Sequence, residues 1–268
     1  MKFGCVTHEI GRIGLLADMG FDYVELGLRA LAPLQDEETF GPIRDRILEA
    51  PLPCEALSGF IPPYAGLKVV GPEADRQSLR RYVEAMIGRA AQIGSRVIVF
   101  GSGQARAVPD GFPYPRALDQ LRDFLAMTAD LAAPLGLTIA IEVLNLGETN
   151  LINSMSEAIG LVRSVNRPSL RNTIDYYHVL TDMQPLDQIA QAGSLLVHAH
   201  TSDVDRRPPG TGVGDQRAFL AALRAAGYDA RLSIECRFQD FEREAPVALG
   251  LLRSLWADVG KPNATGGG

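Results

Sequence analysis

Short apolar runs alternate with longer amphipathic segments along this chain of 268 residues, and this alternation limits the fold more than any other feature. The apolar runs are rich in Val, Ile and Leu and are mostly continuous, as expected of strands buried on both faces. Eight of these runs are predicted to be strands: 3–7, 23–26, 54–58, 96–101, 137–143, 172–176, 195–201 and 231–236.

The segments between these strands carry helix signals. Apolar residues recur every three or four positions over 79–91 and over 118–135, as on one face of a helix. Ser154 and Glu157 have the spacing of a capping box, which marks the start of a helix. Glycine tolerates the left-handed conformation that ends a helix. We therefore predict that helices end at four glycines that precede strands: Gly20, Gly94, Gly136 and Gly227.

Eight strands alternating with helices predict an α/β protein, a single (β/α)8 TIM barrel. An open, doubly wound sheet is the alternative, because alternation alone does not require the sheet to close. No Ser/Gly-rich linker and no shift in composition divides the chain, so we expect residues 1–260 to form one barrel domain. The last residues, 261–268, have the sequence KPNATGGG and are expected to be a flexible tail.

Composition and charge exclude several other classes of protein. Hydrophobic residues at 46% and charged residues at 22% are typical of an ordinary globular chain. No apolar run approaches the roughly 20 residues of a membrane-spanning helix, and we see no secretory signal, so we expect a cytoplasmic protein without a membrane partner. The formal net charge of −6 argues against nucleic acid as a partner. Cys5, Cys54 and Cys236 lie far apart, which suits reduced thiols better than a disulfide framework.

Two glycine-rich segments resemble phosphate-binding loops only in part. Residues 101–106 (GSGQAR) follow a predicted strand, and residues 209–215 (PGTGVGD) contain three glycines. Neither segment has the full fingerprint of strand, GxGxxG, helix and later acidic residue that a dinucleotide site requires. The prolines after the first segment are expected to prevent an immediate helix. Both segments are therefore interpreted as tight or substrate-facing loops.

Four ionisable residues lie at the ends of predicted strands in the second half of the chain: Glu142, Asp175, His200 and Glu235. Their separations of 33, 25 and 35 residues are each close to one βα repeat. In a barrel, consecutive strand ends meet at the same rim, where the βα loops form the active site. Converging carboxylates repel one another unless a cation compensates them. The oxygen-rich set predicts a divalent metal at the C-terminal rim, with Mn²⁺ expected and Mg²⁺ or Co²⁺ as alternatives.

Each of these residues also has a structural interpretation. A glutamate at a strand end is often an ion-pair partner, Asp175 alone could cap a helix, and His200 alone could be a hydrogen-bonded core histidine. The combination at repeat spacing favours the metal site. His198 and His200 share one face of their strand, so spacing alone does not choose between them.

Four segments of this half resemble the sugar isomerase/epimerase superfamily of xylose isomerase-like TIM barrels: IEVLNLGETN, TIDYYHV, HAHTSDVDRRPPGTGVGD and GYDARLSIE. The pattern is most similar to ketose 3-epimerases and hydroxypyruvate isomerases, and it covers roughly residues 136–240. The family has its metal histidine six residues before an arginine, here Arg206, which selects His200. The resemblance implies one metal site formed by Glu142, Asp175, His200 and Glu235.

The resemblance also implies substrate contacts for Glu148, His178 and Arg206. In the first half it is weaker: His8 and Glu25 occupy places where the family has variable substrate-facing groups, and we include His8 among the expected substrate contacts. The segment SGFIPP, which starts at Ser58, is expected to form a loop at the rim. Arg106 is expected either to bind a carboxylate or phosphate, or to pair with an acid at the surface.

The implied activity is a metal-dependent isomerase or epimerase that moves a proton at the carbon next to the carbonyl of a ketose or related hydroxyketone. Glu142 and Glu235 would be the catalytic pair, one removing a proton and the other returning one. The alternatives are a lyase or deglycosidase acting on an oxidised sugar, an endonuclease IV-like phosphodiesterase and a non-catalytic sugar-binding barrel. The nuclease would need more histidine ligands than the sequence supplies. The expected partner is a small sugar or sugar derivative, and a homo-oligomer is compatible with this fold.

Overall fold

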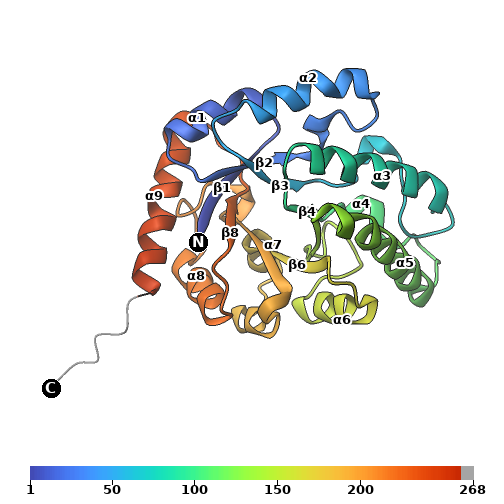
Figure 1. Cartoon of the computed structure of the whole chain (residues 1–268). Coiled ribbons are helices and arrows are strands. Elements are labelled where there is room, and N and C mark those ends of the chain that lie inside the picture. Colours follow the sequence, from blue (N-terminus) through green and yellow to red (C-terminus); the bar gives the residue numbers. More distant parts are fainter. Residues whose placement is uncertain (261–268) are drawn as a thin grey trace.

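The computed structural model describes residues 1–260 and shows a closed barrel of eight parallel strands (Figure 1). Each strand pairs with the next along the chain, and β8 pairs with β1 through contacts such as Cys5 with Ile234. The barrel prediction is thus confirmed, and the open-sheet alternative is wrong. The strands are β1 (Lys2–Thr7), β2 (Tyr23–Gly27), β3 (Cys54–Ser58), β4 (Val97–Phe100), β5 (Thr138–Glu142), β6 (Leu170–Asp175), β7 (Leu196–Thr201) and β8 (Arg231–Ile234).

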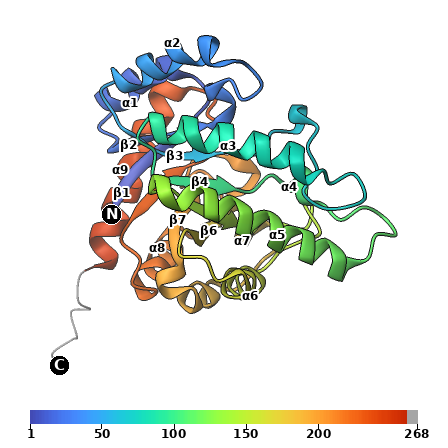
Figure 2. The ribbon, with the colours of Figure 1, turned by 45° about the vertical axis from the view of Figure 1, so that its right-hand side comes forward.

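Helices follow the strands and surround the barrel, as the two views of the ribbon show (Figures 1 and 2). Short 3-10 helices occur in several loops, among them η1 (Ile10–Arg12), η2 (Leu28–Leu31) and η7 (Val204–Arg206). The α-helices are α1 (Ile13–Asp18), α2 (Glu37–Leu48), α3 (Arg76–Gln92), α4 (Gly103–Arg106), α5 (Tyr114–Ala132), α6 (Met155–Val165), α7 (Tyr176–Thr181), α8 (Gln216–Ala225) and α9 (Phe241–Val259).

The predicted helix ends are confirmed. The four junction glycines adopt positive φ angles of 89°, 76°, 68° and 73° in chain order. At the start of α6, Ser154 Oγ accepts a hydrogen bond from the Glu157 backbone N–H, and the Glu157 carboxylate accepts one from the Ser154 N–H. One local prediction was wrong, because α4 forms within the GSGQAR segment. Its single turn ends at Arg106, before the first proline, so no proline interrupts it.

Successive residues of each strand point alternately into the barrel and outward toward the helices. The outward residues of β2 and β4, Leu26 and Ile98, belong to the large core between sheet and helices. The inward residues Tyr23 and Val99 pack together inside the barrel. Gly4 makes room for this interior, because a Cβ there would lie 2.3 Å from the Tyr23 ring. The barrel centre is thus filled with side chains, and the site lies above this filling.

An ion-pair cluster lies at the amino end of the barrel. Glu55, at the start of β3, accepts hydrogen bonds from Arg231 Nε at 2.5 Å and from Lys2 Nζ. Burial opposes ionisation of Glu55, but the bonds to Lys2 and Arg231 outweigh it and lower the pKa of the carboxyl. The cluster joins residues from β1, β3 and β8, so it bridges the seam where the barrel closes.

The predicted tail, residues 261–268, lies outside the described residues. Over residues 1–260, no helix combines the length and the apolar composition that crossing a membrane would need. The expected cytoplasmic location, the absence of a nucleic-acid partner and the homo-oligomer stay predictions.

Candidate active site at the carboxyl end of the barrel

The four predicted metal ligands come together at the carboxyl end of the barrel. Glu142 and Asp175 are the last residues of β5 and β6, His200 is next to last in β7, and Glu235 directly follows β8. One side-chain ligand atom from each of them lies within 4.8 Å of those of the other three. His200 Nδ1 lies 3.2 Å from Glu142 Oε1 and 3.2 Å from Glu235 Oε2. The sequence spacing therefore corresponds to a real cluster.

The two histidines of β7 have different positions in this cluster. Both rings point into the barrel, with their centroids 4.9 Å apart and their planes nearly perpendicular. His200 presents Nδ1 to Glu142 and Glu235, whereas His198 is buried and its Nε2 contacts Glu25. The geometry therefore agrees with the choice of His200 over His198 as the ligand-type histidine.

Glu25 lies in the barrel interior and not at the rim, where the sequence analysis had placed it. It is fully buried. Its Oε1 lies 2.9 Å from His200 Nε2, while its Oε2 lies 2.7 Å from His198 Nε2 and accepts a 2.6 Å hydrogen bond from Ser233 Oγ. The reason is register, since Glu25 lies two residues before the end of β2 and points inward one layer below the rim. His198 and Ser233 likewise precede His200 and Glu235 by two residues, which is the sequence signal for this layer.

Charge compensation explains how these buried groups coexist. Burial opposes the charged form of His200, but the carboxylates of Glu25 and Glu235 outweigh it and raise the pKa of the imidazole well above its usual value. Burial also opposes ionisation of Glu25, yet the charges of His200 and His198 hold the pKa of that carboxyl well below its usual range. The site is thus built as an alternation of positive and negative groups.

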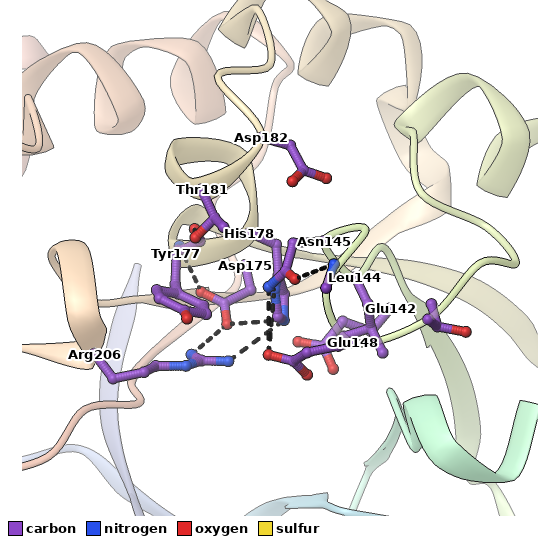
Figure 3. A network of polar contacts seen from close by, with 12 residues as sticks. Glu142, Leu144, Asn145, Glu148, Asp175, Tyr177, His178, Thr181, Asp182 and Arg206 are labelled. Atoms are coloured by element: carbon purple, nitrogen blue, oxygen red, sulfur yellow. Dashed lines mark hydrogen bonds and ion pairs between the residues drawn. The ribbon is translucent and has the colours of Figure 1, made fainter. Parts of the chain in front are cut away.

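Arg206 lies beside the predicted ligand Asp175 (Figure 3). Its Nη1 donates hydrogen bonds to Asp175 Oδ2 and, at 2.9 Å, to Glu235 Oε2, and its guanidinium lies over the Tyr177 ring. Together with His200, it lowers the pKa of Glu235 against the effect of burial. The structure places the Arg206 guanidinium beside two of the three ligand-type carboxylates, and its substrate contact stays a prediction.

The backbone at Arg206 is unusual. Asp205 and Arg206 both adopt left-handed conformations, with φ angles of 58° and 56°. Such conformations cost free energy in non-glycine residues and cluster at functional sites. The Arg206 carbonyl accepts a 2.6 Å hydrogen bond from the Arg237 N–H, which fixes the loop after β7 against the loop after β8.

His178 is held beside this cluster by a residue that the sequence analysis did not single out (Figure 3). Asn145 Nδ2 lies 2.8 Å from His178 Nδ1 and donates a 3.3 Å hydrogen bond to Glu148 Oε1. His178 Nε2 lies 3.7 Å from Asp175 Oδ2 and 3.4 Å from Arg206 Nη2. His178 is buried, whereas 46% of the Glu148 side chain is exposed at the opening of the site. The only sequence signal that Asn145 belongs to the site is its position between Glu142 and Glu148.

Arg106 does not lie on the surface. It is fully buried, and its Nη2 donates a 2.7 Å hydrogen bond to the main-chain carbonyl of Glu142. Burial lowers the pKa of its guanidinium to about 10, while Glu142 and Glu148 act in the opposite direction. Arg106 therefore supports the strand end that carries Glu142, and the expected role in binding an anion does not fit its position.

The glycine-rich segments serve close packing, although residues 103–106 of the first segment form helix α4 and not the predicted loop. A Cβ at Gly101 would lie 2.3 Å from Glu142 Oε2, so this glycine leaves room for the carboxylate. In the second segment, the N–H groups of Gly210, Gly212 and Gly214 donate to the carboxylate of Asp203. A side chain of the protein thus takes the position that an anion would have in a phosphate-binding loop.

Two cavities open on either side of His8. One, of about 680 Å³, extends over the SGFIPP loop as expected and is lined by His8, Ser58, Tyr64 and Glu148 among others. The other, of about 460 Å³, is lined by His8, Arg206 and Glu235 together with residues of the loops after β1, β2 and β8. His8 is therefore at the rim as predicted, where burial and the charge of Arg29 lower its pKa.

The donor set fits a divalent cation. Three carboxylates and one imidazole nitrogen converge, and oxygen-rich sets of this kind suit Mg²⁺ and Mn²⁺. His200 directs its other ring nitrogen to the carboxylate of Glu25, an arrangement typical of metal-bound histidine. A second group, Glu25 with His198 and His200, also has ligand-type atoms close together. Its atoms are engaged in the hydrogen bonds described above, so we interpret it as support for the first group.

Known proteins similar to this chain include sugar epimerases. A ketose 3-epimerase from Arthrobacter globiformis is 32% identical over 136 residues, which are 48% of this chain and 46% of that protein. The chain thus spans less than half the length of this relative. A D-psicose 3-epimerase from Agrobacterium fabrum is 25% identical over 238 residues, which are 87% of this chain and 79% of that protein.

Solved structures and a family model show the fold and the family of the chain. A crystal structure of a D-psicose 3-epimerase in the presence of D-fructose has a TM-score of 0.82 at 21% identity, covering 96% of this chain and 99% of that chain. This likeness shows a shared fold. The sequence model of a family described as "Xylose isomerase-like TIM barrel" matches residues 13–255. The chain belongs to the xylose isomerase-like TIM barrel family.

Proposed function

We propose that this protein is a metal-dependent sugar isomerase or epimerase that transfers a proton at the carbon next to the carbonyl of a ketose or related hydroxyketone. The observation that carries the proposal is the convergence of three carboxylates and one imidazole within 4.8 Å at the active rim of the barrel. The epimerases among the similar proteins support the same reaction class.

The residues that would hold the cation are Glu142, Asp175, His200 and Glu235, with Mn²⁺ as the expected ion and Mg²⁺ or Co²⁺ as alternatives. A divalent cation bound there would act as a Lewis acid that stabilises the negative charge developing on the substrate oxygens. The protein contributes the rest of the chemistry. Glu25 would hold His200 so that Nδ1 faces the site, and Arg106 would hold the strand end of Glu142.

Glu142 and Glu235 would act as the general base and the general acid in proton transfer. They come from β5 and β8, so they approach the site from different parts of the barrel rim. A substrate carbon between them would lose its proton to one carboxylate and receive a proton from the other, which inverts that carbon. Return of the proton to the neighbouring carbon would give isomerisation instead. The same two groups therefore serve both reactions.

His178, Glu148, Arg206 and His8 would bind the substrate hydroxyl and carbonyl oxygens. Asn145 would fix the ring of His178 from the side away from Asp175. The two cavities on either side of His8 offer space for a sugar chain in both directions from the cluster.

Solvent exchange tests this function. Incubation of the Mn²⁺-loaded protein with a panel of ketoses in D₂O should place deuterium on the carbon next to the carbonyl, measured by NMR. Glu142→Gln and Glu235→Gln should each lower the exchange rate by about 10²- to 10⁴-fold, because each removes a general acid–base group. Glu38→Gln, an exposed change on α2, should leave the rate unchanged.

Circular dichroism should show that all three variants are folded. Full activity of both active-site variants would contradict the assignment of the two glutamates. Absence of exchange with every ketose would contradict the proposed reaction itself. Release of an unsaturated product, without return of the proton, would show a lyase instead.

A further inference from the structure

Three arginines lie side by side next to the proposed catalytic centre. Arg12 is in η1 after β1, Arg29 is in η2 after β2, and Arg237 is in the loop after β8. Because β1 pairs with both β2 and β8, these three loops are neighbours although they come from opposite ends of the chain. All three arginines line the 460 Å³ cavity that also contains Arg206 and Glu235.

Positive charge exceeds negative charge in this cavity. Its lining contains four arginines but only two acidic residues, Glu9 and Glu235. Arg206 is paired with Asp175 and Glu235, and Arg12 is paired with the exposed Glu9 at 2.8 Å. Within residues 1–260, the exposed side chains of Arg29 and Arg237 have no acidic partner. Two guanidinium groups are therefore available to a ligand.

The cavity also has a rigid wall. The rings of Phe238 and Phe241 meet edge to face with centroids 5.3 Å apart, and the Arg12 guanidinium lies 4.7 Å from the centroid of Phe241. Stacking on an aromatic ring restrains a guanidinium without using its hydrogen-bond donors. Arg12 is thus held in place with donors that can still face the cavity.

His8 connects this cavity with the second one. It lines both, as Arg29 does, and the predicted metal ligand Glu235 lies in the wall of the first. A substrate centred on the carboxylate cluster would therefore have one end beside the arginines and the other beside Ser58, Tyr64 and Glu148. Guanidinium groups bind carboxylates and phosphates through paired, charge-assisted hydrogen bonds.

We propose that the substrate is a hydroxyketone with an anionic end group, a carboxylate or a phosphate, and that Arg12, Arg29 and Arg237 bind this group. This inference rests on the proposed function for the position of the reacting carbon. It adds a binding subsite and a substrate class to that function, since none of the three arginines belongs to the four ligand-type residues.

A matched series of ketoses tests the subsite. D-Fructose, D-fructose 6-phosphate and D-fructuronate differ only at carbon 6, which carries a hydroxyl, a phosphate or a carboxylate. With the Mn²⁺-loaded protein, kcat/KM for exchange should be about ten- to a hundredfold higher for at least one anionic ketose than for D-fructose, because charge-assisted bonds are added. The better of the two anions identifies the end group. An equal or higher value for D-fructose than for both anions would overturn the proposal.

Paired variants show whether the arginines cause the preference. The double change Arg29→Gln and Arg237→Gln should reduce the ratio of kcat/KM values, anionic over neutral, toward one. Arg163→Gln removes an exposed arginine from α6, outside both cavities, and should keep the ratio of the unchanged protein. An unchanged ratio in the double variant would also overturn the proposal.

A binding measurement separates this inference from the proposed function. Inorganic phosphate is titrated calorimetrically into the metal-loaded protein, the double variant and Arg163→Gln. Loss of phosphate binding in the double variant alone supports the subsite, even if no ketose undergoes exchange and the proposed reaction fails. Equal binding by all three proteins would place the phosphate on the metal and would contradict the subsite.

Discussion

Glu25 shows how a single buried carboxylate can organise a cluster of ionisable side chains. Its two oxygens contact both histidines of β7 and Ser233 of β8. A buried carboxylate is costly unless it is paired, and here its partners compensate the charge. A carboxylate on one ring nitrogen of a histidine fixes the ring and leaves the other nitrogen free for a ligand. Glu25 therefore sets the direction of His200 Nδ1.

Replacement of Glu25 by Gln should weaken divalent-cation affinity by about 10- to 100-fold, which is typical when the hydrogen-bond partner of a ligand is lost. The neutral amide keeps only one acceptor oxygen for the two imidazoles, and its NH₂ group faces the other ring nitrogen. Titration of Mn²⁺ followed by electron paramagnetic resonance of the free ion measures the affinity. Glu38→Gln is the control and should bind Mn²⁺ like the unchanged protein. Unaltered affinity in Glu25→Gln would show that the ring is fixed by packing alone.

Gly101 limits the position of Glu142. Gly101→Ala would put a methyl group 2.3 Å from Glu142 Oε2, so the carboxylate must move. Mn²⁺ affinity and the exchange rate should both fall, while circular dichroism stays native. Gly88→Ala on α3 is the matched control, because a Cβ there has open space. It should stabilise the protein by about 0.5–1 kcal/mol without changing either readout. Equal Mn²⁺ binding by both variants would contradict this steric role.

The difference between predicted and unpredicted site residues follows from their depth in the barrel. Glu142 and Asp175 are the last residues of their strands, so spacing along the chain is enough to bring them to one rim. Glu25 is two residues deeper, and only the register of β2 against its neighbours reveals that it meets His198 and His200. Asn145 depends on the path of an irregular loop, which no periodicity encodes.

At the scale of elements, the start of α6 depends on a local signal. Ser154→Ala removes the Oγ acceptor of the capping box and should lower the free energy of unfolding by about 0.5–2 kcal/mol. The midpoint of urea denaturation measures this loss. Ser156→Ala, an exposed change in the first turn of the same helix, should have little effect or a small stabilising one. Equal destabilisation by both changes would contradict the role of the cap.

Short helices were harder to predict than strands and long helices. The strands and the long helices α3 and α5 have clear apolar patterns, and they lie close to their predicted ranges. Helix α7 has only six residues and starts directly after β6, where Asp175 caps it. Asp175 Oδ1 accepts a hydrogen bond from the Tyr177 N–H, while Oδ2 contacts Arg206. One side chain therefore caps a helix and also belongs to the carboxylate cluster, the two alternatives that the sequence offered for it.

At the scale of the whole molecule, the two ends of the barrel have different tasks. The carboxyl end carries the candidate active site, while the amino end carries the Glu55 cluster that joins β1, β3 and β8. Residues at the amino end of a TIM barrel contribute to stability and not to chemistry. The stability of the closed barrel should therefore depend on the ionisation of Glu55.

Glu55→Gln should lower the free energy of unfolding at pH 7 by about 1–3 kcal/mol, because it removes charged hydrogen-bond partners of Lys2 and Arg231. The pKa of Glu55 is lowered in the folded protein. Its stabilising effect is thus complete above the unfolded-state pKa of about 4.3 and is lost as pH falls through the folded-state pKa. Urea denaturation of both proteins between pH 3 and 7 should show a difference that shrinks in acid. A difference independent of pH would contradict this linkage.

Barrel closure has a consequence for how the protein matures during translation. The hydrogen bond from Ser233 to Glu25 joins residues 208 positions apart. The 460 Å³ cavity is lined by residues of the loops after β1, β2 and β8. A domain generally folds as a unit, and the ribosome releases its C-terminal part last, so contacts between distant parts of the chain form late. A nascent polypeptide that stalls before β8 therefore carries Glu142, Asp175 and His200 but lacks Glu235 and the loop after β8 that completes the 460 Å³ cavity.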